Sequence, residues 1–363
     1  MTELLLAVDV DGDGAHPAAW RHSGRAPGAV LGARALLEVT AAADQAGFAL
    51  ASFADSPLPP SAGPDAAGRL EAGTRAAYVA TRTDRAGLAP ELHVTTTEPF
   101  HLATQLASLD YASHGRAAWV VGAARSAEAL ATVGAAPLSA AAARQEVADV
   151  IDVARALWDS WEDDAVIKDV VTGRYLDPGK VHHVDFAGAA FTVKGPLITP
   201  RPPQGQVVVL APDALEVDDR ADIVLVARPD LRAISVRAEQ ARQAGAPLVF
   251  AEVEVVLDGA GPAQSRLREL DDATPWPASG RLRHVGSPAA LTELLAALAE
   301  VVDGVRLHPA VLAADVPVLA GTVLPALAAG GRLRAPRPGD TLRASLRLPR
   351  PANRLAAPAT TPA

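Results

Sequence analysis

The stretch Leu4-Leu5-Leu6-Ala7-Val8-Asp9-Val10 is an apolar run interrupted only by Asp9, which predicts a buried strand. Residues 30–46 follow with apolar side chains at helical spacing, and they end at Gly47, a residue typical of helix C-termini. Phe48–Phe53 is a second apolar run. These residues predict a β-α-β unit. Because the strands are continuous rather than alternating, we expect a parallel sheet that is covered on both faces.

The same alternation of strands and helices continues along the chain. Further strands are predicted at Gly87–Thr95, Ala117–Val121, Gln206–Ala211, Ile223–Ala227, Pro247–Val256 and Gly304–Leu307. Further helices are predicted at Leu70–Thr83, Pro99–Ser113, Ala140–Trp161, Ala233–Ala244, Pro288–Val301 and Val316–Ala329. About eight strands in alternation with helices predict an α/β protein with a (β/α)8 TIM barrel. A doubly wound open sheet is the competing architecture, since no internal repeat decides between the two.

Two stretches depart from this alternation. Residues 163–203 are irregular and rich in Gly and Pro, and residues 260–287 are polar and irregular. We predict a single barrel domain over residues 1–330, with an insertion at about 163–203 after the fourth strand and helix. The Arg- and Pro-rich tail at 331–363 is expected to wrap over the surface or to be partly disordered. The acidic run from Asp159 to Asp164 is expected to be a solvated helix end.

Composition limits the classes of function. The 363 residues carry a net charge of −9, which argues against a general nucleic-acid binder because such a protein needs a basic face. The chain has no Cys, so cysteine nucleophiles and thiolate metal sites are excluded. No uninterrupted apolar run reaches the roughly 20 residues of a membrane span, and no signal peptide is recognisable. We therefore expect a soluble cytoplasmic protein without a membrane partner.

No generic catalytic motif is present. Asp9-Val10-Asp11-Gly12-Asp13-Gly14 begins like a calcium loop, but its twelfth position is Trp20 instead of Glu. His182 and His183 are adjacent on an extended segment and point to opposite faces, so they do not predict a metal site. The residues alone indicate an enzyme-like α/β protein of unknown chemistry.

One long stretch is more specific. It begins with Leu157-Trp158-Asp159-Ser160-Trp161-Glu162-Asp163-Asp164-Ala165 and continues through Thr172-Gly173-Arg174-Tyr175-Leu176-Asp177-Pro178-Gly179-Lys180-Val181-His182 to Pro200-Arg201-Pro202-Pro203-Gln204-Gly205. Together with Phe53-Ala54-Asp55 and Glu98-Pro99-Phe100-His101, it closely resembles the nitrilotriacetate monooxygenase group of bacterial-luciferase-like, flavin-dependent monooxygenases.

The resemblance implies a luciferase-like TIM barrel and an oxidoreductase. It implies that reduced FMN is a diffusible co-substrate, delivered by a separate NADH-dependent flavin reductase. Reduced FMN and molecular oxygen would form a flavin hydroperoxide that oxygenates a small organic substrate. Homodimers or homotetramers are implied as well. Since the cofactor supplies the oxygen chemistry, neither a catalytic triad nor a metal is expected.

The resemblance and the barrel fold also imply where the site lies. The active site of a TIM barrel lies at the carboxyl ends of its strands. This places candidate cofactor-binding residues at Asp55, Thr95, Thr96, Arg144 and Asp213, and a candidate substrate-binding residue at His101. Thr97 lies at the same rim. No catalytic residue is assigned.

Several positions differ from the family pattern where the flavin is held. The family's Asn after the fourth-strand Trp is replaced within Trp119-Val120-Val121-Gly122. In the following helix the family has a His and an Arg-Tyr pair near the flavin, and of these only Arg144 is present here. The family's Ala-Gly-Ser-Ser phosphate loop is replaced by Ala211-Pro212-Asp213-Ala214, in which Pro212 has no amide N–H and Asp213 would repel a phosphate. Two functions stay open: an FMNH2-dependent monooxygenase, and a non-catalytic paralogue that has lost FMN binding and acts as a binding or partner subunit. Use of a deazaflavin fits the motifs less well.

Overall fold

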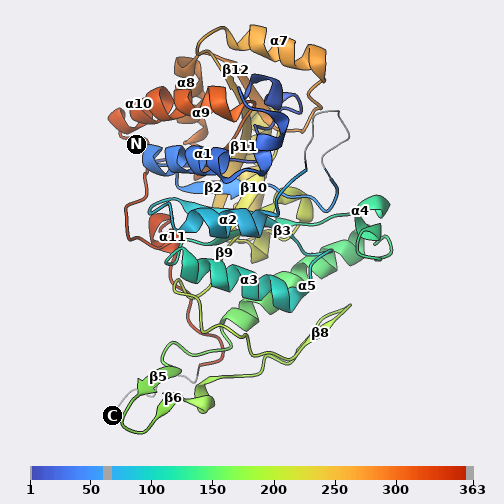
Figure 1. The fold of residues 1–363 in the computed structure, drawn as a ribbon, viewed down its shortest axis with the longest axis vertical. Coiled ribbons are helices and arrows are strands. Elements are labelled where there is room, and N and C mark those ends of the chain that lie inside the picture. The colour runs from blue at the N-terminus through green and yellow to red at the C-terminus, as the bar shows by residue number, and fades with distance from the viewer. Residues whose placement is uncertain (1, 60–67, 357–363) are drawn as a thin grey trace.

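The computed structural model describes residues 2–59 and 68–356, in which eight parallel strands close into a barrel (Figure 1). The strands are β1 (Leu5–Asp9), β2 (Leu50–Phe53), β3 (Gly87–His93), β4 (Ala118–Gly122), β9 (Val208–Pro212), β10 (Ile223–Val226), β11 (Leu248–Leu257) and β13 (Gly304–Pro309). They pair in the order β10-β9-β4-β3-β2-β1-β13-β11, and β10 pairs with β11 to close the ring. All eight coincide with predicted strands. The TIM barrel is confirmed, and the open-sheet alternative is wrong.

Helices surround the barrel, and their ends carry the expected signals. They are α1 (Ala33–Ala46), α2 (Ala72–Ala80), α3 (Pro99–Ala112), α4 (Ala127–Ala131), α5 (Ala140–Trp158), α6 (Leu231–Gln243), α7 (Ala263–Ala273), α8 (Pro288–Leu298), α9 (Leu312–Val318), α10 (Leu324–Ala329) and α11 (Leu342–Ser345). Glu98 accepts hydrogen bonds from the first free N–H groups of α3, and Pro99 begins that helix. Gly47 ends α1 with a φ of +94°, a conformation that glycine adopts without strain.

The structure corrects the sequence-based prediction in two places. No α-helix follows β9: the connection to β10 consists of the short 3-10 helices η4 (Asp213–Leu215) and η5 (Asp218–Arg220). Residues 260–287, which were expected to be irregular, contain α7 and a ninth strand, β12 (Leu282–Gly286). At ten residues, β11 extends beyond the barrel, and β12 pairs in parallel with its carboxyl-terminal half.

The half of the barrel interior at the amino-terminal ends of the strands, called the lower half below, is apolar. The C-terminal segment closes it. Alternate strand residues such as Leu5 and Ala7 face inward and form one cluster with Leu342 of α11 and Leu346, which directly follows that helix. Two glycines make room for larger neighbours. A Cβ on Gly304 would lie 2.4 Å from the Phe250 ring, and one on Gly87 would lie 2.7 Å from Leu342. Large and small side chains therefore interlock at the bottom of the barrel.

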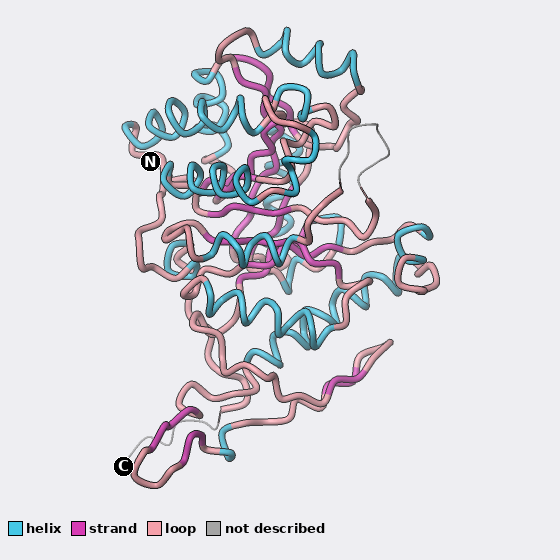
Figure 2. Tube along the Cα trace, in the orientation of Figure 1, coloured by secondary structure: helices cyan, strands magenta, loops and turns pink. Residues whose placement is uncertain are grey.

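The insertion projects away from the barrel and consists mostly of loop (Figures 1 and 2). Within it, β5 (Val166–Asp169) pairs with β6 (Arg174–Leu176), and β7 (Phe186–Ala187) pairs with β8 (Thr192–Val193). The short helix η3 (Pro178–Lys180) lies between the two hairpins.

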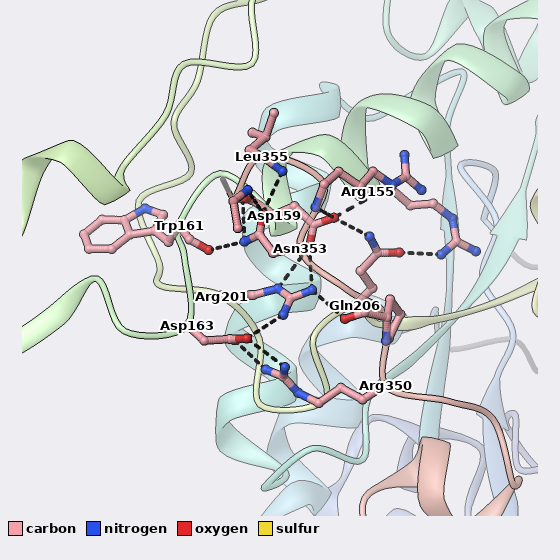
Figure 3. Close-up of polar contacts among 12 residues, drawn as sticks. Arg155, Asp159, Trp161, Asp163, Arg201, Gln206, Arg350, Asn353 and Leu355 are labelled. Carbon is pink, nitrogen blue, oxygen red and sulfur yellow. Dashed lines mark hydrogen bonds and ion pairs between the residues drawn. The ribbon is translucent and has the colours of Figure 1, made fainter. Parts of the chain in front are cut away.

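A polar cluster attaches both the insertion and the C-terminal tail to α5 (Figure 3). The Arg201 guanidinium lies 2.9 Å from carboxylate oxygens of both Asp159 and Asp163, and Arg350 donates to Asp163 at 2.9 and 2.6 Å. Asn353 donates to the Asp159 carbonyl at 3.0 Å. Asp159 is fully buried, whereas Asp163 and Asp164 are exposed, so the acidic run is solvated only at its far end. Tail residues 331–356 are described, while 357–363 lie outside the described residues.

One stretch, Leu312–Ala329, is long and apolar enough to cross a membrane by length and composition alone. It runs through α9, the π-helical turn η6 (Leu319–Val323) and α10, and it packs against α1 and α8. These contacts are those of a helix in the outer layer of a barrel.

Candidate functional site at the barrel mouth

The upper half of the barrel interior is charged, in contrast to the lower half. Side chains alternate along a strand, so residues two positions further along continue the inward face. The inward positions above the apolar cluster are occupied by Asp9 on β1, Ser52 on β2, Glu91 on β3, Glu252 on β11 and Arg306 on β13. His93, Glu254 and His308 occupy the next inward positions. The charged layer lies at the carboxyl ends of the strands, where TIM-barrel active sites are found.

The centre of this layer is an ion pair between Glu252 and Arg306. The Arg306 Nε donates to Glu252 Oε1 at 2.7 Å, and both side chains are at least 92% buried. His308 Nε2 lies 3.3 Å from the same carboxylate oxygen, and its Nδ1 lies 4.0 Å from Asp9 Oδ2. Ser52 donates its hydroxyl to the other oxygen of Asp9 at 2.8 Å. Two hydrogen-bonded groups therefore lie side by side: Ser52 with Asp9 on β2 and β1, and His308 and Arg306 with Glu252 on β13 and β11.

Burial and neighbouring charges set the ionisation of these groups. Burial alone would raise the pKa of Glu252, but Arg306 and His308 hold it well below its usual range, so the carboxyl is ionised. Burial lowers the pKa of His308, and the nearby Arg281 and Arg306 lower it further, so the imidazole is neutral at pH 7. Burial raises the pKa of Glu91 despite the opposing effect of His93. The raised pKa favours the protonated form of the Glu91 carboxyl.

A cavity of about 810 Å³ lies directly above this layer. Asp9, Glu91, Arg306 and His308 line it from the barrel. The rest of its wall comes from the β1–α1 connection, the start of α1, α2 with the residues just before it, and the connection from α7 to β12. These elements contribute the charged or aromatic side chains of Asp11, Asp13, His16, Trp20, Arg21, Arg69, Arg75, Tyr78 and Arg281. Its size is that of a small-molecule site.

Part of the cavity wall is held in place by ion pairs. Asp11 accepts from Arg75 at 2.6 Å and from Arg69 at 3.1 Å. Arg75 comes from α2 and Arg69 from the segment before it, so these pairs fix the β1–α1 connection against the next β/α unit. In the described residues, no group of three or more His, Asp or Glu is placed to hold a metal ion.

The residues predicted on β2 and β3 lie at the strand ends but do not line the cavity. Asp55 accepts backbone hydrogen bonds from Ser56 and Ala72, which join the end of β2 to the first residue of α2. The Thr95 hydroxyl donates to the Ala124 carbonyl at 3.0 Å. Thr96 is half-buried, and His101 is exposed on the first turn of α3. These residues have local structural partners, and their assignment to a ligand stays a prediction.

The residues predicted near β4 and β9 form a second group, which also lies outside the cavity. Arg144, on α5, is half-exposed and pairs with Glu216 just after η4. Asp213 is nearly fully buried, and Oδ2 of its carboxylate lies 2.8 Å from Arg228 and 3.1 Å from Arg237. The structure thus places Arg144 and Asp213 in one region and Asp55, Thr95 and Thr96 in another.

The donor set around β9 does not fit a flavin phosphate. A phosphate needs N–H or O–H donors, but Pro212 has no N–H, and Asp213 presents a carboxylate instead of a donor. The two arginines that could neutralise a phosphate already bind Asp213. No reaction step is therefore assigned to a phosphate held at this position.

Sequence reasoning missed the charged layer of the barrel. The signal was present as pairs of ionisable residues two positions apart: Glu91 and His93, Glu252 and Glu254, and Arg306 and His308. A spacing of two inside an otherwise apolar strand places both side chains on one face. In a barrel, that face is the interior. His93 also explains Gly122, because a Cβ there would lie 2.9 Å from the imidazole.

Comparisons with known proteins agree with this fold. N-acetyl-S-(2-succino)cysteine monooxygenase from Bacillus subtilis (strain 168) is 34% identical over 210 residues, which are 57% of this chain and 48% of the relative. Nitrilotriacetate monooxygenase component A from Aminobacter aminovorans is 40% identical over 144 residues, 39% of this chain and 31% of the relative. The chain thus matches half or less of the length of these curated relatives.

A solved structure extends the likeness to almost the whole chain. EDTA monooxygenase from Chelativorans sp. BNC1 superposes with a TM-score of 0.79 at 20% identity, covering 96% of this chain and 99% of the other. At this identity the likeness shows the fold. The profile of the family described as luciferase-like monooxygenase matches residues 14–260, which is more than half of the sequence. The chain therefore belongs to the luciferase-like monooxygenase family.

Proposed function

We propose that this protein is an FMNH2-dependent monooxygenase that takes reduced flavin from a separate NADH-dependent reductase and oxygenates a small organic molecule with molecular oxygen. The observation that supports this most is the large cavity above a charged layer at the carboxyl ends of the strands, in a chain of this family. Bound reduced flavin would supply the oxygen chemistry. Weak attachment of its phosphate suits a flavin that enters and leaves in each cycle.

The chain's own residues have roles that do not depend on the flavin's position. Glu91 faces the cavity with a raised pKa, so it can hold a proton and deliver it to a group bound above it. Arg306 keeps Glu252 ionised, and the neutral His308 lies within hydrogen-bond distance of the same carboxylate. The Asp11 ion pairs keep the β1–α1 connection over the cavity and limit the access of water.

An anaerobic titration with photoreduced FMN tests the proposal. We expect saturable binding in the micromolar range, measured by the change in flavin absorbance or protein fluorescence. Glu91→Gln should still bind reduced flavin, while the pH dependence of substrate oxygenation shifts because the ionisable carboxyl is lost. Glu300→Gln, at an exposed surface position, is the matched control and should change neither. Absence of reduced-flavin binding up to millimolar concentration would refute the proposal.

A second candidate function is a non-catalytic paralogue that acts as a binding or partner subunit. The observation that favours it is the carboxylate of Asp213, which occupies the arginines near β9. In that case the purified chain would not bind reduced flavin. Size-exclusion chromatography with an active relative would then show a mixed complex.

A further inference from the structure

Asp213 lies between two arginines at the carboxyl end of β9. Arg228 comes from the loop after β10 and reaches Asp213 Oδ2 at 2.8 Å. Arg237 comes from α6 and reaches the same oxygen through its Nε at 3.1 Å. The Asp213 side chain is only 4% exposed. Two elements that follow in sequence thus direct guanidinium groups at one buried carboxylate.

The charges in this region are balanced within the chain. Arg237 also donates to both carboxylate oxygens of Asp218, at 2.8 and 2.6 Å. With two arginines and two carboxylates, the group is neutral. A third anion that entered would displace a carboxylate or lie against one, and both outcomes are unfavourable in a partly buried site.

An open hollow of about 350 Å³ lies beside the pair. Arg228, Arg232 and Arg237 line it, together with Asp230 and apolar and amide side chains of α6. The Asp230 carboxylate caps α6 by accepting from the Ala233 N–H, so the arginines are the groups free to meet an anion, and arginine is well suited to bind phosphate. Removal of the negative charge of Asp213 would therefore leave an accessible site with the chemistry of an oxyanion-binding pocket.

We infer that Asp213 is an internal anion that closes an oxyanion-binding pair formed by Arg228 and Arg237, so that the chain excludes phosphate monoesters from this end of the barrel. The consequence for flavin, which rests on the proposed function, is that the protein binds reduced flavin without using its phosphate. Reduced riboflavin and reduced FMN are then bound equally well.

Inorganic phosphate tests the closed pair directly. Phosphate binding to the folded protein is measured by calorimetry, with circular dichroism to confirm the fold. Asp213→Asn keeps the shape and removes the charge, and it should bind phosphate about 10- to 100-fold more tightly than the wild type, the range expected for hydrogen bonds to charged groups. Asp213→Ser is a second variant, because an Asn carbonyl oxygen could retain one arginine. Asp219→Asn is the control: it makes the same change of charge nearby, at an exposed carboxylate paired with Arg220.

The inference is overturned if both Asp213 variants fold and neither binds phosphate more tightly than the wild type. It is also overturned if Asp219→Asn gains as much as Asp213→Asn, because general electrostatics would then explain the effect.

Reduced flavins test the consequence. The wild type should bind reduced riboflavin and reduced FMN with dissociation constants within about threefold of each other, and Asp213→Asn should prefer FMN by about tenfold. A strong preference of the wild type for FMN would contradict the inference. If the wild type binds neither flavin, the proposed function fails, while the phosphate experiment still decides whether Asp213 closes the arginine pair.

Discussion

The two ends of the barrel interior are built from the same strands but have opposite chemistry. On β13, Gly304 lies in the apolar lower half, whereas Arg306 and His308 lie in the charged upper half. On β11, Phe250 fills the lower half, and Glu252 follows it two residues later. Two residues along a strand span about 7 Å. Within that distance, the interior changes from close-packed side chains to hydrogen-bonded charges.

The two halves of the interior differ in how much they contribute to the stability of the fold. Apolar burial and close packing stabilise the lower half, and α11 keeps it closed. In the upper half, the removal of Glu252 and Arg306 from water costs free energy, which their mutual attraction only offsets. A buried ion pair of this kind contributes little net stability. The pair lies at the floor of the cavity, where Arg306 is one of the lining residues.

The largest effect is expected from removing half of the buried pair. Arg306→Met leaves Glu252 without its main counter-ion, and we expect a loss of about 3–5 kcal/mol in the free energy of unfolding, measured by urea denaturation. The double variant Glu252→Gln with Arg306→Met should recover most of that loss. Arg242→Met removes an arginine from a half-exposed pair with Asp303 and should cost less than about 1 kcal/mol. Equal losses for Arg306→Met and Arg242→Met would show that the upper layer does not behave as a buried ion pair.

The next largest effect concerns the lower end. Leu346→Ala leaves a cavity where α11 closes the barrel, and we expect a loss of about 2–4 kcal/mol, measured in the same way. Reduced-flavin affinity should stay within about twofold of the wild type, since the mouth is unchanged. Leu348→Ala, at a half-buried position in the same segment, is the control and should cost less. A large loss of flavin affinity in Leu346→Ala would mean that the two ends are not independent.

The smallest effect is expected outside the barrel, where similar ion pairs lie partly in water. Hydrogen bonds from Arg350 lower the pKa of Asp163 from 3.8 to about 2, with a further contribution from Arg201. The stabilisation from Asp163 is therefore present above about pH 4 and is lost as the pH falls towards 2. Arg350→Ala should raise this pKa and reduce stability at pH 6 by less than about 1 kcal/mol, with less change at pH 3. Urea midpoints at both pH values measure the difference. Arg347→Ala, which removes an exposed pair with Glu3, is the control. It leaves the pKa of Asp163 unchanged, so its urea midpoint should not show the difference between pH 6 and pH 3 that is expected for Arg350→Ala.

The sequence was sufficient to predict the barrel because its strands are buried on both faces. Val208–Pro212 and Ile223–Val226 are almost fully buried, and continuous apolar runs of this kind stand out even in an alanine-rich chain. The strand β12 was missed because all five of its residues are half-buried, and its sequence includes Arg283 and His284. It is held by its pairing with β11 rather than by burial, and local sequence does not show such pairing.

The site was harder to predict than the fold for a related reason. Glu91, Glu252 and Arg306 belong to strands that are otherwise apolar, and only closure of the barrel brings them together from three distant segments. Of the candidates taken from the resemblance, Asp55, Thr95 and Thr96 lie just beyond the carboxyl ends of β2 and β3. Asp55 and Thr95, however, are engaged with neighbouring backbone groups, a property that only the folded geometry reveals.

The contribution of α11 to the barrel has a consequence for synthesis on the ribosome. Leu342 and Leu346 pack with Leu5 and Ala7, although more than 300 residues separate them. A nascent chain could pair all eight strands and still have an open lower end until residues 342–346 emerge from the exit tunnel. The apolar interior would be accessible to chaperones during that interval. Closure of the lower end would therefore depend on the docking of one short helix rather than on the pairing of a strand.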